Sequence, residues 1–247
     1  MTTKNKKRKW KKVMFYLILA FGFLVFAGIT FVLIWASNGY SAESQATNYV
    51  QEEVDRDSNT GLAFGTGEEV TGIVLYPGAR VNYKAYSYLA HRLNEEGLFV
   101  YVPRMPLDLA IFNRNRAGDV MEKFPGVDRW YVAGHSLGGA MGAFYVANHP
   151  DSVEGMIFLA SYPGNDLTDV GVSVLSIYGG LDGVSTPEDI KERDERLPDD
   201  AVYVEIEEGN HANFGWYGPQ RGDLESPLTP QEQQDIVTEE IVRWIGE

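Results

Sequence analysis

The sequence predicts an α/β domain with a doubly wound, mainly parallel sheet, preceded by a transmembrane helix. Residues 13–35 form an uncharged run, and seven Lys and Arg side chains directly precede it. Beyond residue 70, short apolar runs alternate with helical patterns. Strands that alternate with helices connect through right-handed crossovers, which cover both faces of a parallel sheet. Because ligands in such sheets lie beyond the carboxyl ends of the strands, functional residues are expected in the loops after strands.

The N-terminal segment indicates a membrane anchor. Residues 13–35 are long enough, at about 1.5 Å per residue, to cross a hydrocarbon core of about 30 Å. The preceding cations favour a cytoplasmic N-terminus, so the remainder is expected on the extracytoplasmic side of the cell membrane. We therefore interpret 1–12 as a basic cytoplasmic segment, 13–35 as a signal-anchor, 36–47 as a polar tether and 48–247 as the domain. A cleaved signal peptide is the alternative, although its apolar region is usually only about 7–15 residues.

Charge and cysteine content exclude several kinds of function. The formal net charge is −14, and without the seven N-terminal cations 14 Lys and Arg stand against 35 Asp and Glu, a net of −21. So acidic a domain repels phosphate backbones, which argues against a nucleic-acid partner. The absence of Cys excludes disulfides, thiolate metal sites and a cysteine nucleophile.

The first half of the domain is expected to begin with two short antiparallel strands, at 48–54 and 61–64, joined by a turn. Residues 72–76 are apolar and stop at Pro77-Gly78, which predicts a buried strand. Asn82 can cap a helix that continues at helical spacing to Gly97. The next strand is expected at 98–102.

The second half continues the alternation and ends in a long helix. A helix at 114–123 is expected to stop at Pro125-Gly126, and a strand at 129–133 leads into an Ala- and Gly-rich helix at 137–148. Two later helices begin with Pro, which suits a first helical turn. The remaining expected elements are strands at 156–160, 172–178 and 202–206, and helices at 187–196 and 230–245.

The segment Gly134-His135-Ser136-Leu137-Gly138 fits the pattern Gly-x-Ser-x-Gly. The strand before it and the helix after it give it the context of a nucleophile elbow. The serine at the tip of such a turn has strained backbone angles, and the glycines let strand and helix approach closely. Ser136 is therefore the candidate nucleophile, and a glycine-rich structural turn is the alternative.

A catalytic serine needs a base that takes its proton and an acid that orients the base. With such an elbow, the chain order is serine, acid, histidine. Of four histidines, only His211 follows both Ser136 and a suitable acid. Asp182, after the preceding strand, is the candidate acid, with Asp166 and Asp169 as alternatives.

The oxyanion of an acyl-transfer intermediate needs two backbone N–H donors. One is expected from Leu137, the residue after the nucleophile. The other is expected from the loop Pro77-Gly78-Ala79-Arg80, where Ala79 is the predicted donor and Gly78 permits close approach.

Five stretches of the domain carry a resemblance to a known family: 75–80, 103–107, 134–140, 176–183, and 209–214 with 217–220. From about residue 61 onward, the sequence resembles the α/β-hydrolase superfamily, in particular a bacterial subgroup described as α/β-hydrolase fold family 5. The resemblance implies an α/β-hydrolase fold, a triad of Ser136, Asp182 and His211, and no metal or organic cofactor. One departure is Pro77-Gly78, where many esterases carry His-Gly.

Four residues are weaker candidates for substrate contact. Arg80 and Arg104 follow strands and could bind a carboxylate or phosphate, although pairing with acidic residues is the alternative. Phe214 and Trp216 follow the candidate base and could wall an acyl pocket. Only residues 104–113 and 162–171 could form a lid, so an open site is expected.

These residues predict a membrane-anchored carboxylesterase or thioesterase that acts on a small-molecule acyl ester through an acyl-enzyme. An amidase or peptidase would use the same triad. A non-catalytic surface binding protein is a third hypothesis, and it would be expected to lack a triad member.

Overall fold

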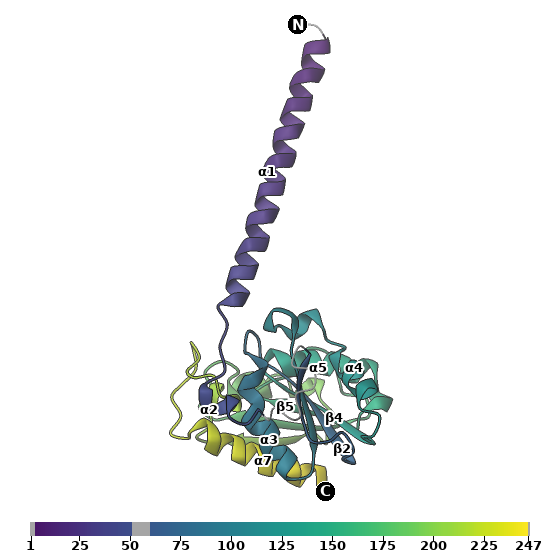
Figure 1. Cartoon of the computed structure of the whole chain (residues 1–247), viewed down its shortest axis with the longest axis vertical. Helices are drawn as coiled ribbons and strands as arrows, with labels where there is room; N and C mark the ends of the chain where they lie inside the picture. The colour runs from purple at the N-terminus through teal and green to yellow at the C-terminus, as the bar shows by residue number, and fades with distance from the viewer. Residues whose placement is uncertain (1–2, 51–59, 247) are drawn as a thin grey trace. The chain divides into compact units, whose positions relative to one another are not determined.

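The computed structural model describes residues 3–50 and 60–246 and contains two compact units, Met1–Gly39 and Tyr40–Glu247 (Figure 1). The first unit is one helix, α1 (Thr3–Ser37). Within it, Lys12–Ser37 is long and apolar enough to cross a membrane, and its large hydrophobic side chains are exposed. These 26 residues extend over about 39 Å, so the predicted span at 13–35 falls inside a single helix.

The second unit, called the globular unit below, alternates strands and helices as predicted. Its strands are β1 (Gly61–Phe64), β2 (Thr71–Tyr76), β3 (Phe99–Pro103), β4 (Arg129–His135), β5 (Gly155–Leu159), β6 (Ser173–Gly179) and β7 (Val202–Ile206). Its helices are α2 (Ser44–Thr47), α3 (Ser87–Glu95), α4 (Arg116–Lys123), α5 (Leu137–Asn148), α6 (Pro187–Lys191) and α7 (Pro230–Gly246). Short 3-10 helices lie at Tyr83–Tyr86, Pro106–Asp108, Ala110–Phe112, Pro150–Ser152, Asp194–Arg196 and Ala212–Phe214.

The strands form one sheet in the order β1-β3-β2-β4-β5-β6-β7. Among the strands in the described residues, only β1 runs antiparallel to its neighbour. Strands β2 to β7 are parallel, which confirms the predicted mainly parallel fold. The predicted partner strand at 48–54 is not present in its described part, residues 48–50, and the rest lies outside the described residues. β1 pairs instead with β3, through Gly61 opposite Pro103.

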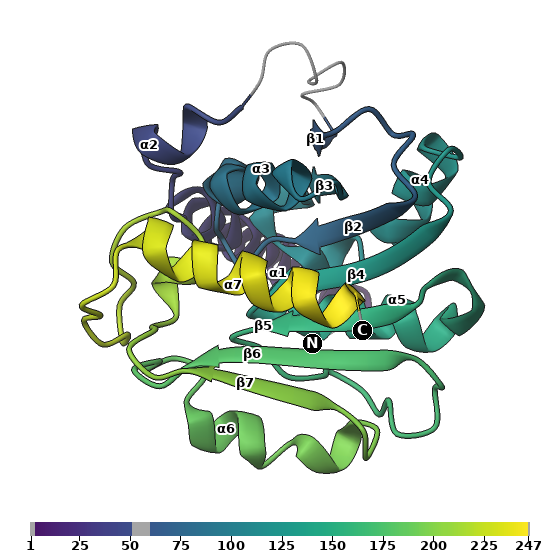
Figure 2. The same ribbon diagram turned by 90° about the horizontal axis from the view of Figure 1, so that it is seen from below.

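Both faces of the sheet are covered by helices. On one face, Leu89 and Leu93 of α3 and Val237 and Ile241 of α7 join a buried cluster with the sheet; Figure 2 shows α3 and α7 lying across it. On the other face, side chains of α4 and α5 form a second cluster. Burial of each such aliphatic side chain stabilises the fold by about 1.5–3 kcal/mol, so the two helical layers hold the sheet in place.

Two helix starts carry the residues expected there, Asn82 as a cap and Pro187 in a first turn. The Asn82 side chain accepts the backbone N–H of Lys84 at 3.0 Å, where the 3-10 helix that leads into α3 begins. Thr186 and Asp189 form a capping box at the start of α6, with Pro187 in its first turn.

The structure differs from the predicted tether at 36–47, because the globular unit begins at Tyr40. Tyr40 forms an isolated bridge with Val81, and its ring packs 5.4 Å from that of Tyr217. Glu43 donates its N–H to the Trp216 carbonyl at 3.0 Å. The polar composition suggested a free segment, but its few apolar side chains pack on the domain.

The sheet register brings the predicted functional loops to one edge. Tyr76, the last residue of β2, is opposite Gly134 of β4, so the loop after β2 lies beside the elbow. Gly179, at the end of β6, is opposite Ile206, at the end of β7. The loops that carry Asp182 and His211 therefore leave the sheet side by side.

Candidate active site

Ser136 occupies the turn between β4 and α5 with φ 51° and ψ −126°. Residues other than glycine rarely adopt this positive-φ backbone conformation. The turn is stabilised by the Ser136 N–H, which donates to the Leu159 carbonyl at 3.0 Å. A Cβ on Gly138 would lie 2.3 Å from the Tyr76 carbonyl oxygen, so only glycine fits where α5 meets the loop after β2. The geometry is that of the strained elbow expected from the sequence.

His211 and Asp182 form a buried pair. His211 Nδ1 lies 2.7 Å from Asp182 Oδ2, and neither side chain is exposed to solvent. The other carboxylate oxygen accepts the backbone N–H groups of Val184 at 2.8 Å and Ser185 at 2.7 Å. Because a carboxylate only accepts, the neutral imidazole carries its proton on Nδ1. Nε2 is then an acceptor, and it is buried without a hydrogen-bond partner among the described residues.

Asp223 holds the two loops of this pair together, and the sequence reasoning did not find it. One of its oxygens accepts the N–H groups of Gly183 at 3.1 Å and His211 at 3.2 Å. The other accepts the Ala212 N–H at 2.8 Å. Asp223 lies in a long segment without strand or helix periodicity, so no sequence pattern marks it.

A buried glutamine from α7 supports the loop before His211. The Gln233 side chain accepts the Asn210 N–H at 3.0 Å and donates to the Asn210 carbonyl at 2.9 Å. This two-point contact fixes the backbone that presents the imidazole.

A second buried network joins the elbow to the loop after β2. The Tyr86 hydroxyl accepts the Gly78 N–H at 2.8 Å and lies 2.8 Å from His135 Nδ1. The His135 ring lies 4.6 Å from the ring of His211 and stacks on Phe214. Gly78 is close to this network, since a Cβ there would lie 2.8 Å from His135 Nδ1. His135, the residue before Ser136, therefore contacts both Tyr86, which holds the loop after β2, and the imidazole ring of His211.

The predicted oxyanion donors have unused N–H groups. Within residues 3–50 and 60–246, the N–H groups of Ala79 and Leu137 donate to no protein acceptor. The Gly78 N–H, in contrast, is taken by Tyr86. A donor from this loop is therefore available at Ala79 and not at Gly78.

The alternative acids lie in a local turn. Asp166 is exposed and accepts the N–H and hydroxyl of Thr168 at 2.9 and 2.7 Å. Asp169 is also exposed. The structure brings Asp182, and neither of these residues, to His211.

The four candidates for substrate contact have different surroundings. Arg80 is half-buried with φ 58°, and Arg104 is exposed. Phe214 is fully buried and stacks against the His135 ring, so it packs in the core beneath the site. Trp216 packs edge-on against Tyr88 of α3 at 5.6 Å.

The pH dependence of the unfolding free energy should reveal the lowered pKa of His135. Burial, and then the nearby His211, lower the pKa of His135 well below its ordinary value of 6.5. The unfolded chain takes up this proton near pH 6.5 and the folded chain does not. His135 therefore contributes stability that is complete above pH 6.5 and is lost as pH falls toward the lowered pKa, by up to about 1.4 kcal/mol per pH unit. Urea unfolding of the full chain in detergent, followed by Trp fluorescence, measures this.

The matched variant for that measurement is His135→Phe, which keeps an aromatic ring but cannot titrate. We expect the difference in unfolding free energy between wild type and variant to shrink as pH falls below 6.5. Carboxylates contribute equally to both proteins and cancel. Curves that stay parallel would contradict a depressed pKa.

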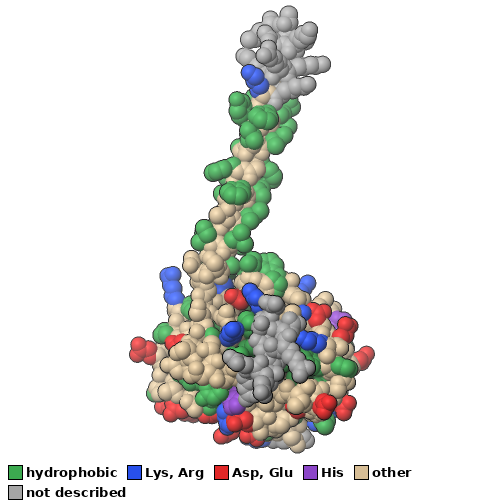
Figure 3. Space-filling view, in the orientation of Figure 1, with side chains coloured by type: hydrophobic (Ala, Val, Ile, Leu, Met, Phe, Trp, Pro, Cys, Tyr) green, Lys and Arg blue, Asp and Glu red, His purple; other side chains and the backbone are tan. Residues whose placement is uncertain are grey.

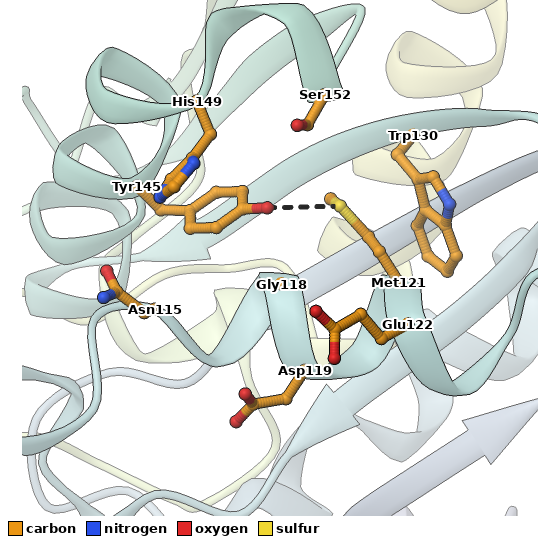
Figure 4. A pocket seen from close by; sticks show the side chains of 9 residues that line it. All are labelled: Asn115, Gly118, Asp119, Met121, Glu122, Trp130, Tyr145, His149 and Ser152. Carbon is orange, nitrogen blue, oxygen red and sulfur yellow. Dashed lines mark hydrogen bonds between the residues drawn. The ribbon is translucent and has the colours of Figure 1, made fainter.

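A separate hollow of about 460 Å³ lies toward the amino end of β4 (Figure 4). Trp130 and Tyr145 form part of its wall, and the Tyr145 hydroxyl lies 3.4 Å from Met121 Sδ. None of its nine lining residues belongs to the predicted triad or to the loop after β2. Ser136 follows the opposite end of β4, so this hollow is no part of the candidate site.

Together these contacts provide the parts for nucleophilic catalysis. A neutral imidazole held by a carboxylate can take a proton from a hydroxyl, and backbone N–H groups near the same turn can stabilise an oxyanion. Ser136 supplies the hydroxyl in the elbow.

Known proteins resemble the chain in sequence and fold. A sequence model described as the alpha/beta hydrolase family matches residues 72–235. No curated protein sequence matches the chain. A similar solved structure is MGS-MChE2, an alpha/beta hydrolase from a sediment metagenome of the Mar Chica lagoon, Morocco (17% identity, 75% of this chain and 94% of that chain covered, TM-score 0.59).

Two further structures carry descriptions of their activity or ligand. A monoacylglycerol lipase from Paleococcus ferrophilus has 16% identity, with 74% of this chain and 98% of that chain covered and a TM-score of 0.59. Est1E from Butyrivibrio proteoclasticus, solved with ferulic acid, has 14% identity, with 73% and 91% covered and a TM-score of 0.56. At such identities the likeness establishes the fold.

Proposed function

The chain belongs to the alpha/beta hydrolase family, and on that premise we propose that it is a membrane-anchored serine hydrolase that cleaves carboxylic esters or thioesters. The observation that carries the proposal is the buried His211–Asp182 pair. The Nε2 of His211 has no hydrogen-bond partner among the described residues, and its ring lies 4.6 Å from that of His135, the residue before the serine of the strained elbow. A buried pair of this kind is weak evidence for a role in stability, because well-packed apolar residues of similar volume often stabilise a fold as well.

In the proposed reaction, Ser136 Oγ attacks the acyl carbonyl carbon while its proton passes to His211 Nε2. The carbonyl oxygen becomes an oxyanion held by the N–H groups of Leu137 and Ala79. The C–O or C–S bond then breaks, and the protonated imidazole gives its proton to the leaving alkoxide or thiolate. Water, deprotonated by His211, then attacks the acyl carbon. The bond from this carbon to Ser136 Oγ breaks, the imidazolium returns its proton to Oγ, and the acid is released.

Asp182 keeps the proton of His211 on Nδ1 and stabilises the imidazolium that forms during each transfer. Its second oxygen is already bonded to two backbone N–H groups, so the carboxylate cannot rotate away from the imidazole.

Esters are the first substrates to test, because one protein of similar fold is described as a monoacylglycerol lipase. A second protein of similar fold, Est1E, was solved with ferulic acid, a carboxylic acid. The experiment is a panel of p-nitrophenyl esters from acetate to palmitate, run with the full chain in detergent beside matched p-nitroanilides. Turnover of esters well above that of anilides supports the proposal. Preference for anilides would favour the amidase or peptidase alternative, and no turnover of either would favour a non-catalytic binding protein.

We also propose that α1 is an uncleaved single-pass anchor with the globular unit on the extracytoplasmic side. The seven cations before residue 13 support this orientation. Because the chain lacks Cys, Ser152→Cys, at an exposed position, provides a single thiol. A membrane-impermeant maleimide should label the full-length protein in intact cells. Labelling that requires permeabilised cells would contradict the orientation.

Replacing Tyr86 with Phe tests how the loop after β2 is positioned. The variant keeps the ring but leaves the Gly78 N–H without its acceptor, so the loop that carries Ala79 loses an attachment to the elbow. We expect kcat for p-nitrophenyl butyrate to fall about 10- to 100-fold, because small displacements of an aligned group cost that much. KM should change little.

A purely structural role for Tyr86 makes a different prediction. It would lower the melting temperature and leave kcat per folded molecule unchanged. Measuring kcat by active-site titration, together with the melting temperature, separates the two.

A further inference from the structure

An exposed apolar segment lies beside the loop after β2. Residues 104–114, called the apolar loop below, expose Leu107, Ile111 and Phe112 by 44, 55 and 56%. In the described part of the globular unit, five large hydrophobic side chains are at least 44% exposed, and three of them lie within the six residues 107–112 of this loop. Isolated exposed hydrophobics are ordinary, but such a cluster is typical of a binding surface.

The exposed position of these side chains is built into the backbone. Leu107 and Asp108 have φ values of 55° and 52°, a backbone conformation that residues other than glycine rarely adopt. The Asp108 carbonyl accepts the Arg80 N–H at 2.7 Å, and this bond ties the strained turn to the loop after β2. The backbone of the apolar loop is therefore held in place by its turn and by its bond to Arg80.

The charge of the apolar loop is opposite to that of the domain. Arg104 and Arg114 are exposed within it, and Asp108 is its only acidic residue, whereas the chain beyond residue 12 carries a net −21. Figure 3 shows that Lys and Arg side chains also gather on the upper part of the globular unit, while Asp and Glu are frequent along its margins. Apolar side chains flanked by cations fit the surface of an anionic bilayer.

Hydrogen bonds through Arg80 connect the apolar loop to Tyr40, the first residue of the globular unit. Arg80 donates its N–H to Asp108 and accepts the Tyr40 N–H on its carbonyl, at 2.7 Å in each case. Tyr40 begins the globular unit, and only Asn38 and Gly39 separate it from Ser37, the last residue of α1. Three residue steps reach at most about 11 Å, so a bilayer that holds α1 cannot be far from Tyr40.

We propose that the apolar loop is a membrane-contacting lip, whose Leu107, Ile111 and Phe112 side chains enter the interfacial region of an anionic phospholipid bilayer. The lip is bonded through Arg80 to the loop that carries the predicted oxyanion donor, so an ester with a long acyl chain passes from the bilayer to Ser136 along it. The substrate class is then an amphiphilic lipid ester. This inference rests on the proposed function and on the proposed anchor.

Depth-dependent quenching tests the contact, and the chain's lack of Cys makes the labelling specific. The full chain carrying Phe112→Cys is labelled with a nitrobenzoxadiazole maleimide and reconstituted in phosphatidylcholine vesicles with or without phosphatidylglycerol, with doxyl lipid as quencher. The matched control is Val70→Cys, which is 59% exposed at the amino end of β2. We expect quenching at Phe112→Cys to exceed that at Val70→Cys about threefold or more, and to be stronger with phosphatidylglycerol.

Activity provides the second measurement. Phe112→Asp should lower turnover of dioleoylglycerol in vesicles about tenfold relative to Val70→Asp, because a charge on the lip opposes its insertion. Equal quenching at the two labelled positions, with ester turnover intact, would overturn the proposal that the apolar loop contacts the membrane. A label response that follows protein concentration and not lipid would identify a second copy of the chain as the occupant and also overturn it. Absence of p-nitrophenyl butyrate turnover in the wild type would instead overturn the proposed function.

Discussion

Ser136→Ala is expected to reduce kcat for p-nitrophenyl butyrate by about 10⁴- to 10⁶-fold, because removing the nucleophile of a triad abolishes the acyl-enzyme route. Substrate binding does not depend on the hydroxyl, so KM, where measurable, should change little. The backbone turn does not require the hydroxyl either, since the Ser136 N–H and not Oγ bonds to Leu159. The measurement is steady-state kinetics on the full chain in detergent, with the melting temperature as a check on folding.

Ser152→Ala is the matched control for this experiment. Ser152 is an exposed serine that follows the far end of α5, in the rim of the separate hollow. Its replacement should leave kcat within about twofold of wild type. Retention of more than about a tenth of the activity by Ser136→Ala would contradict the assigned nucleophile.

Asp182→Asn is expected to reduce kcat by about 10⁴-fold, because an amide can hold His211 in the wrong tautomer. The Asn side-chain oxygen can still accept the N–H groups of Val184 and Ser185, so the loop should keep its conformation. The loss should therefore appear in kcat with little change in the melting temperature. Kinetics and thermal unfolding of the same preparation measure both.

Asp166→Asn is the control that separates the two candidate acids. Asp166 is exposed and bonds only within its own turn, to Thr168. Its replacement should change kcat by less than about twofold. If Asp166→Asn lost activity while Asp182→Asn retained it, the acid would have been misassigned.

The fold was predictable because its signals are local. The apolar run over 72–76 stops at Pro77-Gly78, and β2 ends at Tyr76. The Ala- and Gly-rich stretch after Ser136 becomes α5 over the predicted residues, Leu137–Asn148. In both cases the residues that define the element are neighbours in the chain, so periodicity and turn residues suffice.

Chain order, together with the position of both residues after strands, favoured the pairing of Asp182 with His211 without making it unique. Both residues follow strands, and parallel neighbours place their carboxyl ends at one edge. The sequence could not exclude Asp166 and Asp169, because each also follows a strand. The distance of 2.7 Å between His211 Nδ1 and Asp182 Oδ2 distinguishes them.

The supporting contacts were beyond the reach of sequence reasoning. The bond between Tyr86 and His135 joins residues 49 positions apart, and Asp223 reaches Gly183 across 40. Tyr86 lies in a helical pattern where a buried tyrosine is ordinary packing, so nothing marked its hydroxyl. The contacts of Tyr40 with Val81 and Tyr217 lie beyond sequence reasoning for a related reason, since the composition of residues 40–47 does not mark them.

The most direct test of the central claim is the site of modification by a fluorophosphonate. The full chain in detergent is treated with a fluorophosphonate probe, digested, and sequenced by mass spectrometry beside Ser136→Ala. The proposed mechanism predicts one stoichiometric adduct on Ser136 Oγ, complete loss of esterase activity as it forms, and no adduct in the variant. An active enzyme that remains unlabelled at Ser136, or one inactivated by an adduct on another residue, would contradict it.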